Sequence, residues 1–302
     1  MTFPGFFKNT FKMEPARPEQ TQDTHKHDYI ALCVNNLKKY KRMKTQIILW
    51  SCIFLAGITS VSAQFSETIV SDRPGQSNSP YTVGKMVLQF QTGPQFDGAD
   101  ADNYKNNSFS WPAFVRFGIT DKIEVQTLWS YQSENTEEYI FDSKRNGLNA
   151  ADFGLRFNIF EETDKAPALG FEVLYKTKLK SDDYQPDHSS AKINFMSSKT
   201  LSDLLSLTAN LGVDYDGDGG APTGLYTLNL VFVVKEELSV FFENYGNFGR
   251  DDFNTYFDFG GAYLLNPNLQ LDLYGGFGYN NDTFTYLVSS GISYRIIKWK
   301  KD

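Results

Sequence analysis

The stretch Ser108–Tyr131, SFSWPAFVRFGITDKIEVQTLWSY, contains the pattern that decides the fold class. Apolar side chains largely alternate with polar or small ones from Phe109 to Ile119, and again from Ile123 to Tyr131. Alternation with a period of two is the signal of a β-strand, and the short turn between the two runs predicts a hairpin. Soluble strands usually have about 5–6 residues, whereas tilted membrane strands need about 9–11. The length of both runs fits the membrane strand.

The same alternation recurs along the chain and predicts an all-β fold. We expect about twelve strands, at residues 84–93, 107–118, 122–131, 149–160, 167–178, 190–200, 204–215, 223–234, 237–246, 253–265, 268–279 and 283–296. Short connections alternate with longer ones near 94–106, 132–148, 179–189, 216–222, 247–252 and 280–282. Outer-membrane barrels have this asymmetry, with short periplasmic turns and longer outer loops. The sequence therefore predicts an antiparallel up-and-down transmembrane β-barrel over residues 84–302, with both ends on the periplasmic side.

Aromatic residues gather at the loop-side ends of the expected strands. We predict a membrane girdle made of Trp111, Trp129, Tyr131, Tyr175, Tyr215, Tyr226, Tyr245, Tyr279 and Phe284. Amphipathic rings at one level are typical of a barrel held at the membrane interface. A secreted β-sandwich also alternates apolar and polar residues, but nothing in it requires aromatic residues at one height. The pattern favours the membrane barrel, with outer-membrane lipid as a partner.

The segment Met43–Ala63 has the layout of a secretory signal peptide. Basic residues precede the apolar run Ile47–Ile58, and Val61–Ala63 supplies the small residues of a cleavage site. A spanning helix needs about 20 apolar residues, so the alternative of a transmembrane anchor is disfavoured. We expect translation to start at Met43, which makes Met1–Arg42 non-native. The alternative is that Met1–Arg42 is a genuine but disordered extension. The predicted localisation is the outer membrane of a Gram-negative bacterium, reached through a cleaved signal peptide.

The charge balance excludes several classes of function. Residues 1–63 carry nine of the 29 basic and four of the 36 acidic residues, so the mature chain has a net charge of −12. Nucleic acid is an unfavourable partner, because phosphate binding needs a basic surface. Both cysteines, Cys33 and Cys52, lie upstream of the cleavage site. The exported chain is therefore expected to have neither disulfides nor thiolate chemistry.

Charged residues recur on the polar faces of the expected strands. In a barrel they face the lumen, where we predict Arg116, Glu124, Asp152, Arg156, Glu172, Lys176, Asp258, Asp272 and Arg295. Buried charges must pair with one another or contact water. Two interpretations stay open: an interior salt-bridge network that supports the barrel, or a narrow hydrated path whose charges select solutes.

Two short motifs suggest other chemistry. His188 lies beside Ser189 and Ser190, which raises the alternative of a membrane-embedded esterase, although the members of a catalytic triad usually come from distant strands. Asp214–Gly220, DYDGDGG, resembles the start of a calcium loop, but Leu225 stands where such a loop needs a glutamate. We expect a channel rather than an enzyme, with no cofactor and no metal site.

The end of the chain carries a pattern related to barrel assembly. Within SSGISYRI, Ser289–Ile296, the spacing of Gly291, Tyr294 and Ile296 resembles the terminal-strand signal read by the barrel assembly machinery. The usual signal ends at the C-terminus, whereas here IKWKKD follows. An amphipathic last strand with an unpaired edge is also what a closing barrel must present.

The start of the mature chain resembles a known family. Ser71–Pro74 reads SDRP, Ser79–Pro80 follows, and Gln89–Gly93 reads QFQTG. In this order the segments resemble transporter-like outer-membrane barrels of Bacteroidetes-type bacteria, of the phenol-degradation meta-pathway type. The resemblance covers roughly residues 67–297 and implies passage of small, hydrophobic or aromatic solutes by diffusion.

Residues 64–83 are predicted to form a periplasmic lead-in to the first strand. In one interpretation Asp72 and Arg73 fold into the lumen mouth and pair with charges there, as part of a plug. In the other, the segment is a plain solvated lead-in. The predicted function is an outer-membrane channel or transporter for small solutes, and the alternative is a structural or adhesive barrel with a closed lumen.

Overall fold

The computed structural model describes residues 66–139, 141–250 and 252–297, which belong to one compact unit, Ala63–Asp302. The expected signal peptide, the segment Met1–Arg42 and both cysteines lie outside the described residues. Among the helices of the described part, none is long and apolar enough to cross a membrane. The described residues form thirteen β-strands and one short 3₁₀ helix, η1 (Asp182–Tyr184).

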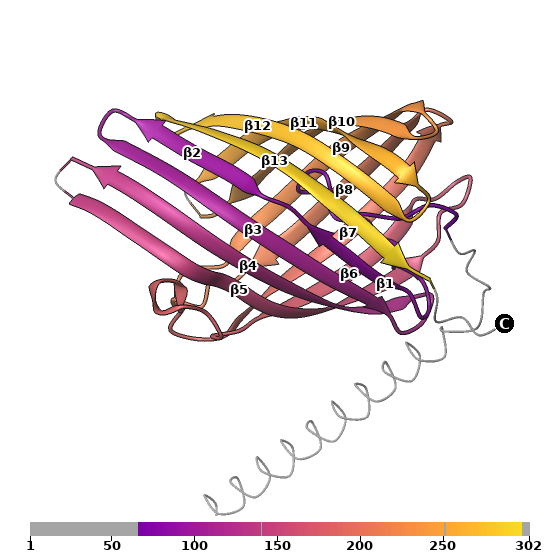
Figure 1. The fold of residues 1–302 in the computed structure, drawn as a ribbon, viewed down its shortest axis with the longest axis horizontal. Helices are drawn as coiled ribbons and strands as arrows, with labels where there is room; N and C mark the ends of the chain where they lie inside the picture. The colour runs from indigo at the N-terminus through magenta and orange to yellow at the C-terminus, as the bar shows by residue number, and fades with distance from the viewer. Residues whose placement is uncertain (1–65, 140, 251, 298–302) are drawn as a thin grey trace, which may run out of the picture. The chain divides into compact units, whose positions relative to one another are not determined.

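The strands form a closed antiparallel ring (Figure 1). They are β1 (Leu88–Thr92), β2 (Gln95–Ala101), β3 (Tyr104–Gly118), β4 (Ile123–Glu138), β5 (Phe141–Phe160), β6 (Ala168–Lys176), β7 (Ser190–Ser202), β8 (Leu205–Asp214), β9 (Thr223–Lys235), β10 (Leu238–Phe248), β11 (Phe253–Asn266), β12 (Leu269–Asn280) and β13 (Thr283–Ile296). From β3 to β13 each strand pairs with the next along the chain.

The first and last strands close the ring. β1 pairs with β13 on one side and with β3 on the other, and β2 lies between the same two strands further along. β1 and β2 are therefore two pieces of one interrupted strand. The structure confirms the predicted all-β, antiparallel barrel of twelve strands.

The interruption lies at Gly93 and Pro94. Proline has no backbone N–H to give to a strand ladder. A Cβ atom on Gly93 would lie 2.0 Å from the carbonyl oxygen of Ser290, so only glycine permits this close approach to β13. The Ser290 amide donates instead to the carbonyl oxygen of Pro94, at 3.2 Å.

Two of the predicted loops are wrong. Residues 94–106 contain β2 and the start of β3, and residues 132–148 lie largely in the ends of β4 and β5. The first residues of β5 pair only with β4, since pairing with β6 begins at Asp152. Figure 1 shows β2 to β5 extending beyond their neighbours at one end. Sequence alternation missed these strand ends because they are polar on both faces.

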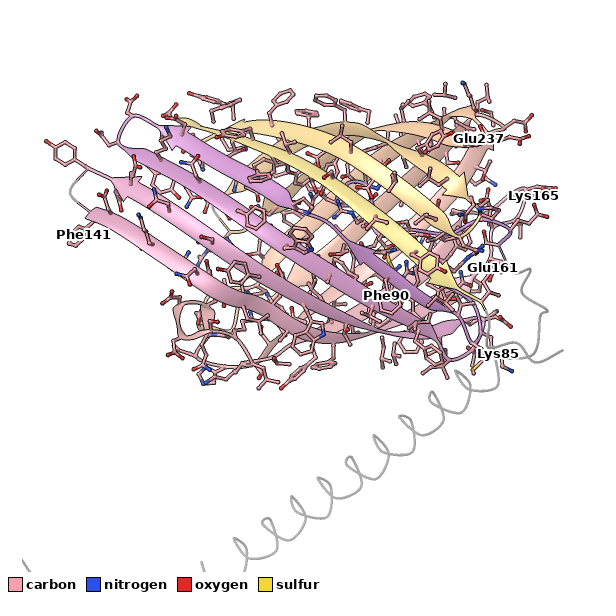
Figure 2. The ribbon with its side chains drawn as sticks, in the orientation of Figure 1. Lys85, Phe90, Phe141, Glu161, Lys165 and Glu237 are labelled. Atoms are coloured by element: carbon pink, nitrogen blue, oxygen red, sulfur yellow. The ribbon has the colours of Figure 1, made fainter. Side chains whose placement is uncertain are left out.

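The barrel is apolar outside and polar inside. Large apolar side chains such as Phe259, Leu273 and Val288 are more than half exposed on the outer face. Arginine, carboxylate and amide side chains occupy the buried inner positions of the same strands. Figure 2 shows Phe141 at one end, and Lys85, Glu161, Lys165 and Glu237 at the other. A broad apolar outer surface around a polar interior is the arrangement of a membrane-spanning barrel.

Eight of the nine aromatic residues predicted for the girdle lie on the outward positions of their strands or at the strand ends: Trp111, Trp129, Tyr131, Tyr175, Tyr215, Tyr226, Tyr279 and Phe284. Tyr245 is an error of the prediction. The odd-numbered residues of β10 face inward, as the buried Phe241 and Glu243 show, and the Tyr245 ring stacks on Tyr256 inside the barrel. Aromatic residues on both faces of β10 made its orientation ambiguous in the sequence. The girdle role of the other eight stays a prediction.

Candidate functional site: the barrel interior and its N-terminal segment

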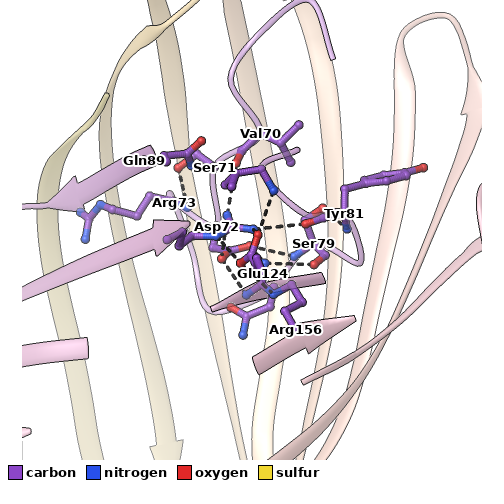
Figure 3. Close-up of polar contacts among 12 residues, drawn as sticks. Val70, Ser71, Asp72, Arg73, Ser79, Tyr81, Gln89, Glu124 and Arg156 are labelled. Carbon is purple, nitrogen blue, oxygen red and sulfur yellow. Dashed lines mark hydrogen bonds and ion pairs between the residues drawn. The ribbon is translucent and has the colours of Figure 1, made fainter. Parts of the chain in front are cut away.

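Residues 66–87, which we call the inner segment, precede β1, and their central part runs inside the barrel (Figure 3). The segment is anchored first at one end of the barrel, where the Ile69 amide donates to the carbonyl oxygen of Pro267. Nearby, the Arg295 guanidinium donates to the carbonyl oxygens of Ser66, Glu67 and Thr68 at 2.9–3.0 Å. The predicted lead-in is thus attached to the turn between β11 and β12 and to β13.

Asp72 lies at the centre of a buried ion-pair network. Its carboxylate contacts the guanidinium of Arg116 at 3.1 Å and that of Arg156 at 2.8 Å. Arg116 also pairs with Glu124 at 2.7 Å, and Arg156 pairs with Glu172. The side chains of both arginines are at most 1% exposed. One carboxylate of the inner segment therefore bridges two charged pairs on β3 to β6.

The charge state of Asp72 follows from this arrangement. Burial alone would raise the pKa of its carboxyl group, because desolvation disfavours the charged form. The positive charges of Arg116 and Arg156, with hydrogen bonds from Arg156 and the Ser79 amide, outweigh burial and hold the pKa of Asp72 below its ordinary value. Asp72 is therefore an anion at neutral pH.

Arg73 binds a different part of the wall. Its guanidinium contacts Asp272 of β12 at 3.0 Å and donates to the Ser289 hydroxyl and the Ser290 carbonyl of β13. A Cβ atom on Gly291 would lie 2.3 Å from Arg73 Nε, so this glycine provides the space for the guanidinium. Two neighbouring residues, Asp72 and Arg73, thus attach the inner segment to two sectors of the barrel.

Backbone groups of the inner segment bind inward-facing side chains of other strands. The amide of Gln76 donates to Glu243 at 2.6 Å, that of Asn78 to Asn210 at 2.7 Å, and that of Val83 to Glu124 at 2.8 Å. Carbonyl oxygens accept from the wall as well: Val70 from Gln89 and Arg116, Arg73 from Gln270, and Pro80 from Asn158. Buried backbone groups need such partners, so the wall is built to hold this segment.

The remaining predicted lumen residues also face the interior but lie apart from the Asp72 network. Lys176 pairs with Asp214 at 2.8 Å, and Asp152 accepts a hydrogen bond from the Thr177 amide. Asp258 is fully buried opposite Glu243 on the neighbouring strand. Asp72, Arg116, Glu124, Arg156 and Glu172 thus form one cluster, and Arg73 with Asp272 a second.

Sequence reasoning missed the neutral partners of the inner segment. Asn210, Gln270 and Ser289 are buried polar residues at inward positions, but an isolated amide or hydroxyl in a strand carries no charge that stands out. The signal that could have found them is their position in the alternation, which places them on the same face as the charged residues.

The candidate assembly signal and the two short motifs have defined places. Gly291 contacts Arg73, Tyr294 points outward, and Ile296 pairs with Leu88 where the ring closes. The His188 amide donates to the carbonyl oxygen of Gly217, so the two loops dock together. Asp218 accepts from the Asp187 amide. Within residues 66–297, as far as they are described, no group of three His, Cys, Asp or Glu side chains could hold a metal ion.

Comparison with solved structures places the fold among outer-membrane barrels. An outer membrane channel from Pseudomonas putida F1 superposes with a TM-score of 0.61 at 10% identity, over 74% of this chain and 100% of that chain. The translocator domain of the autotransporter NalP from Neisseria meningitidis gives a TM-score of 0.50 at 12% identity, over 74% of this chain and 90% of that chain. At these identities the similarity shows the fold alone.

Comparison of the sequence with curated proteins finds no match. The model of the family described as "Putative MetA-pathway of phenol degradation" matches residues 71–296. The match begins at the SDRP motif of the inner segment and ends at the last residue of β13. It includes the buried ion-pair network and the whole barrel, and the chain therefore belongs to this family.

Proposed function

We propose that the protein is an outer-membrane channel for small solutes whose path is closed by the inner segment. The bridge from Asp72 to Arg116 and Arg156 carries the proposal, because it fixes the segment across the interior. These ion pairs form only while the segment lies inside the barrel. They can therefore control passage if the segment is able to leave. A wall that served support alone could pair its own charges.

The localisation follows from the same architecture. The apolar outer surface fits membrane lipid, and the barrel is similar in fold to an outer membrane channel. Export through the signal peptide Met43–Ala63, insertion by the barrel assembly machinery and origin in a Gram-negative bacterium of the Bacteroidetes type belong to this proposal. Residues 1–42 then lie outside the mature protein.

The solute is a small compound, and family membership supports an aromatic one, since the family is described by phenol degradation. The solute passes by diffusion and is not chemically converted. His188 contributes its backbone amide to a loop contact with Gly217, which is a structural use of this segment. We therefore propose no enzymatic activity.

The test is single-channel conductance in a planar bilayer, comparing the protein with Asp72→Ala. Removing one partner of a buried ion pair costs about 3–5 kcal/mol. Shifting the ratio of open to closed states from 1:99 to 99:1 needs about 5.5 kcal/mol. We expect the protein to be closed most of the time and D72A to open at least about tenfold more often. Glu134→Gln is the matched control, because Glu134 pairs with the exposed Arg145 away from the inner segment.

Equal open times for the protein and D72A would contradict closure by the inner segment. Folded barrels that never conduct, in either form, would favour the structural or adhesive barrel with a closed lumen. Heat-modifiable gel migration should accompany both recordings, so that unfolded protein is not counted as closed.

A further inference from the structure

Three carboxylates in one sector of the interior have no basic partner among the residues that the structure describes. Asp97 lies on β2, Glu243 on β10 and Asp258 on β11. Glu243 and Asp258 stand opposite each other in the strand register, and both residues are fully buried. Asp97 lines the same cavity as Gly276, against which Asp258 lies. Negative charge is therefore concentrated on this side of the barrel.

The donors that reach these three carboxylates are neutral. Glu243 accepts from the Gln76 amide and from Asn229, and Asp97 accepts from the side chain of Gln95. Neither oxygen of Asp258 has a hydrogen-bond partner of regular geometry, and the donors beside it belong to Tyr245 and Gln76.

Most other carboxylates of the interior are paired with cations, and Asp152 accepts a hydrogen bond from the Thr177 amide. Asp72, Glu124, Glu172, Asp272 and Asp214 each form an ion pair with an arginine or lysine. Among the described residues, no lysine or arginine lies in ion-pair range of Asp97, Glu243 or Asp258. Burying a charge is costly unless an opposite charge compensates it, so this sector is short of a cation.

A cavity with aromatic walls adjoins the carboxylates. It has a volume of about 240 Å³, and Asp97, Tyr245, Tyr256 and Gly276 are among the residues that line it. The two tyrosine rings are stacked with their centroids 5.2 Å apart. Asp258 lies directly against Gly276, since a Cβ atom on this glycine would be 1.8 Å from Asp258 Oδ1. Aromatic ring faces and carboxylates both attract cations.

The tyrosine pair also lines a second cavity, which has a different character. This cavity of about 220 Å³ is lined by Tyr245 and Tyr256 too, but also by Asn194, Asn210 and Lys192. The lysine ammonium makes that cavity unfavourable for a positive ligand. The cation-attracting cavity is therefore the one that contains Asp97.

We propose that the cavity between Asp97 and the Tyr245–Tyr256 pair binds a small organic cation, an ammonium group carried on an apolar or aromatic body. The ammonium faces Asp97 and Asp258, and the body lies against the tyrosine rings. The inference rests on the proposed channel function, because a site inside the barrel needs a path from outside. It makes amines preferred over neutral compounds of the same shape.

The test is isothermal titration calorimetry of the full-length folded protein in a non-ionic detergent, with benzylammonium chloride and with benzyl alcohol. The two probes have similar size and differ in charge. We expect benzylammonium to bind at least about tenfold more tightly, which corresponds to about 1.4 kcal/mol. Asp258→Asn is expected to reduce this preference several-fold, and Asp97→Asn does the same at a position that is only partly buried. Asp214→Asn is the matched control, because Asp214 already pairs with Lys176.

Equal affinities for the two probes would overturn the site, and so would an equal loss in D214N and D97N, which would indicate attraction by the overall negative charge. D97N decides the matter if D258N does not fold. Bilayer conductance of the same preparation separates the two proposals. A barrel that conducts but shows no preference for the amine would contradict the cation site alone. A barrel that prefers the amine but does not conduct, either unmodified or as D72A, would contradict the channel alone.

Discussion

At the residue scale, the interior depends on a few buried charges shared between the inner segment and the wall. Asp72 joins Arg116 and Arg156 and accepts a hydrogen bond from the Ser79 amide, and each arginine keeps a second carboxylate on the wall. The contacts of Asp72 hold the segment in the proposed closed state, whereas the two arginine–carboxylate pairs of the wall stabilise the barrel itself. Substitution of Asp72 should therefore separate closure from folding.

Arg116→Ala should destabilise the protein strongly. The change leaves Glu124 buried and short of its partner at 2.7 Å, and removes one of the two cations facing Asp72. Breaking a buried pair in this way costs about 3–5 kcal/mol, which a lower midpoint of the heat-modifiable gel shift should report. Arg145→Ala, which breaks an exposed pair with Glu134, should cost about 0–1 kcal/mol. A similar midpoint for both variants would contradict the importance of the buried network.

Closure should weaken in acid. The pKa of Asp72 is lower inside the barrel than its ordinary value of 3.8, because Arg116 and Arg156 outweigh burial. A carboxylate with a depressed pKa contributes stability above its ordinary pKa and loses it as the pH falls toward the lower, folded-state pKa. We predict that open time in bilayers rises below pH 3.8, at the pH where Asp72 takes up a proton. Asp72→Asn should be insensitive to pH in this range, and the same acid response in that variant would assign it to other groups.

At the scale of elements, the long strands β4 and β5 extend beyond the barrel wall as an outer hairpin. The outer ends of β4 and β5 pair with each other from Tyr131 and Leu148 to Glu138 and Phe141. They carry mainly polar side chains, so no membrane burial holds them. Their place beyond the apolar surface suggests that they fold after the barrel wall and add little to its stability.

Replacing residues 134–145 by a two-residue turn should leave the barrel folded. Besides its own hairpin, the removed part pairs with the outer end of β3, from Tyr104 to Ser108, and Arg145 lies over the ring of Tyr184. These contacts lie beyond the apolar surface of the wall. We expect the midpoint of the heat-modifiable gel shift to change little. A deletion of the same length in β7 and β8, which lie in the wall, should abolish the folded band. Loss of folding in the first variant would show that the outer hairpin is part of the barrel's stability.

The sequence was informative where one face of a strand is apolar. The alternation from Phe109 to Ile119 placed a strand and its inward arginine correctly, because lipid and interior demand opposite side chains. It failed for residues 132–148, where both faces contact water or other polar groups, and at Tyr245, where both faces carry aromatic rings. The family resemblance, carried by Ser71–Pro74, was confirmed by the family match.

The contacts of Asp72 and Arg73 show what sequence could and could not supply. Their charges allowed pairing inside the lumen mouth, but a solvated lead-in was an equal alternative. The wall partners could not be identified, because they lie between 44 and 217 residues away and depend on how the ring closes. The amide and hydroxyl partners, such as Asn210 and Ser289, depend on the same closure.

At the scale of the whole molecule, the inner segment is the proposed closing element of a membrane channel. The segment contacts wall strands around much of the ring, from β3 through β10 to β13. The barrel itself closes through β1 and β13, independently of the inner segment. The central claim is that the segment can leave the interior while the wall stays intact.

The most direct test is to lock the segment in place. The hydroxyls of Ser71 and Ser293 of β13 lie 2.8 Å apart, so Ser71→Cys with Ser293→Cys should form a disulfide between segment and wall. Residues 64–302 contain no other cysteine. Ser198→Cys with Thr208→Cys is the matched control, because that 3.1 Å hydroxyl pair joins β7 to β8 and leaves the segment free.

The measurement is the single-channel conductance of each double variant, recorded separately in the same type of bilayer. Each variant is recorded first oxidised and then after addition of a reductant. We predict that the segment–wall variant is silent when oxidised and opens on reduction as often as the unmodified protein. The β7–β8 variant should conduct equally in both states. Undiminished conductance of the oxidised segment–wall variant, with its disulfide verified by mass spectrometry, would contradict closure by the inner segment.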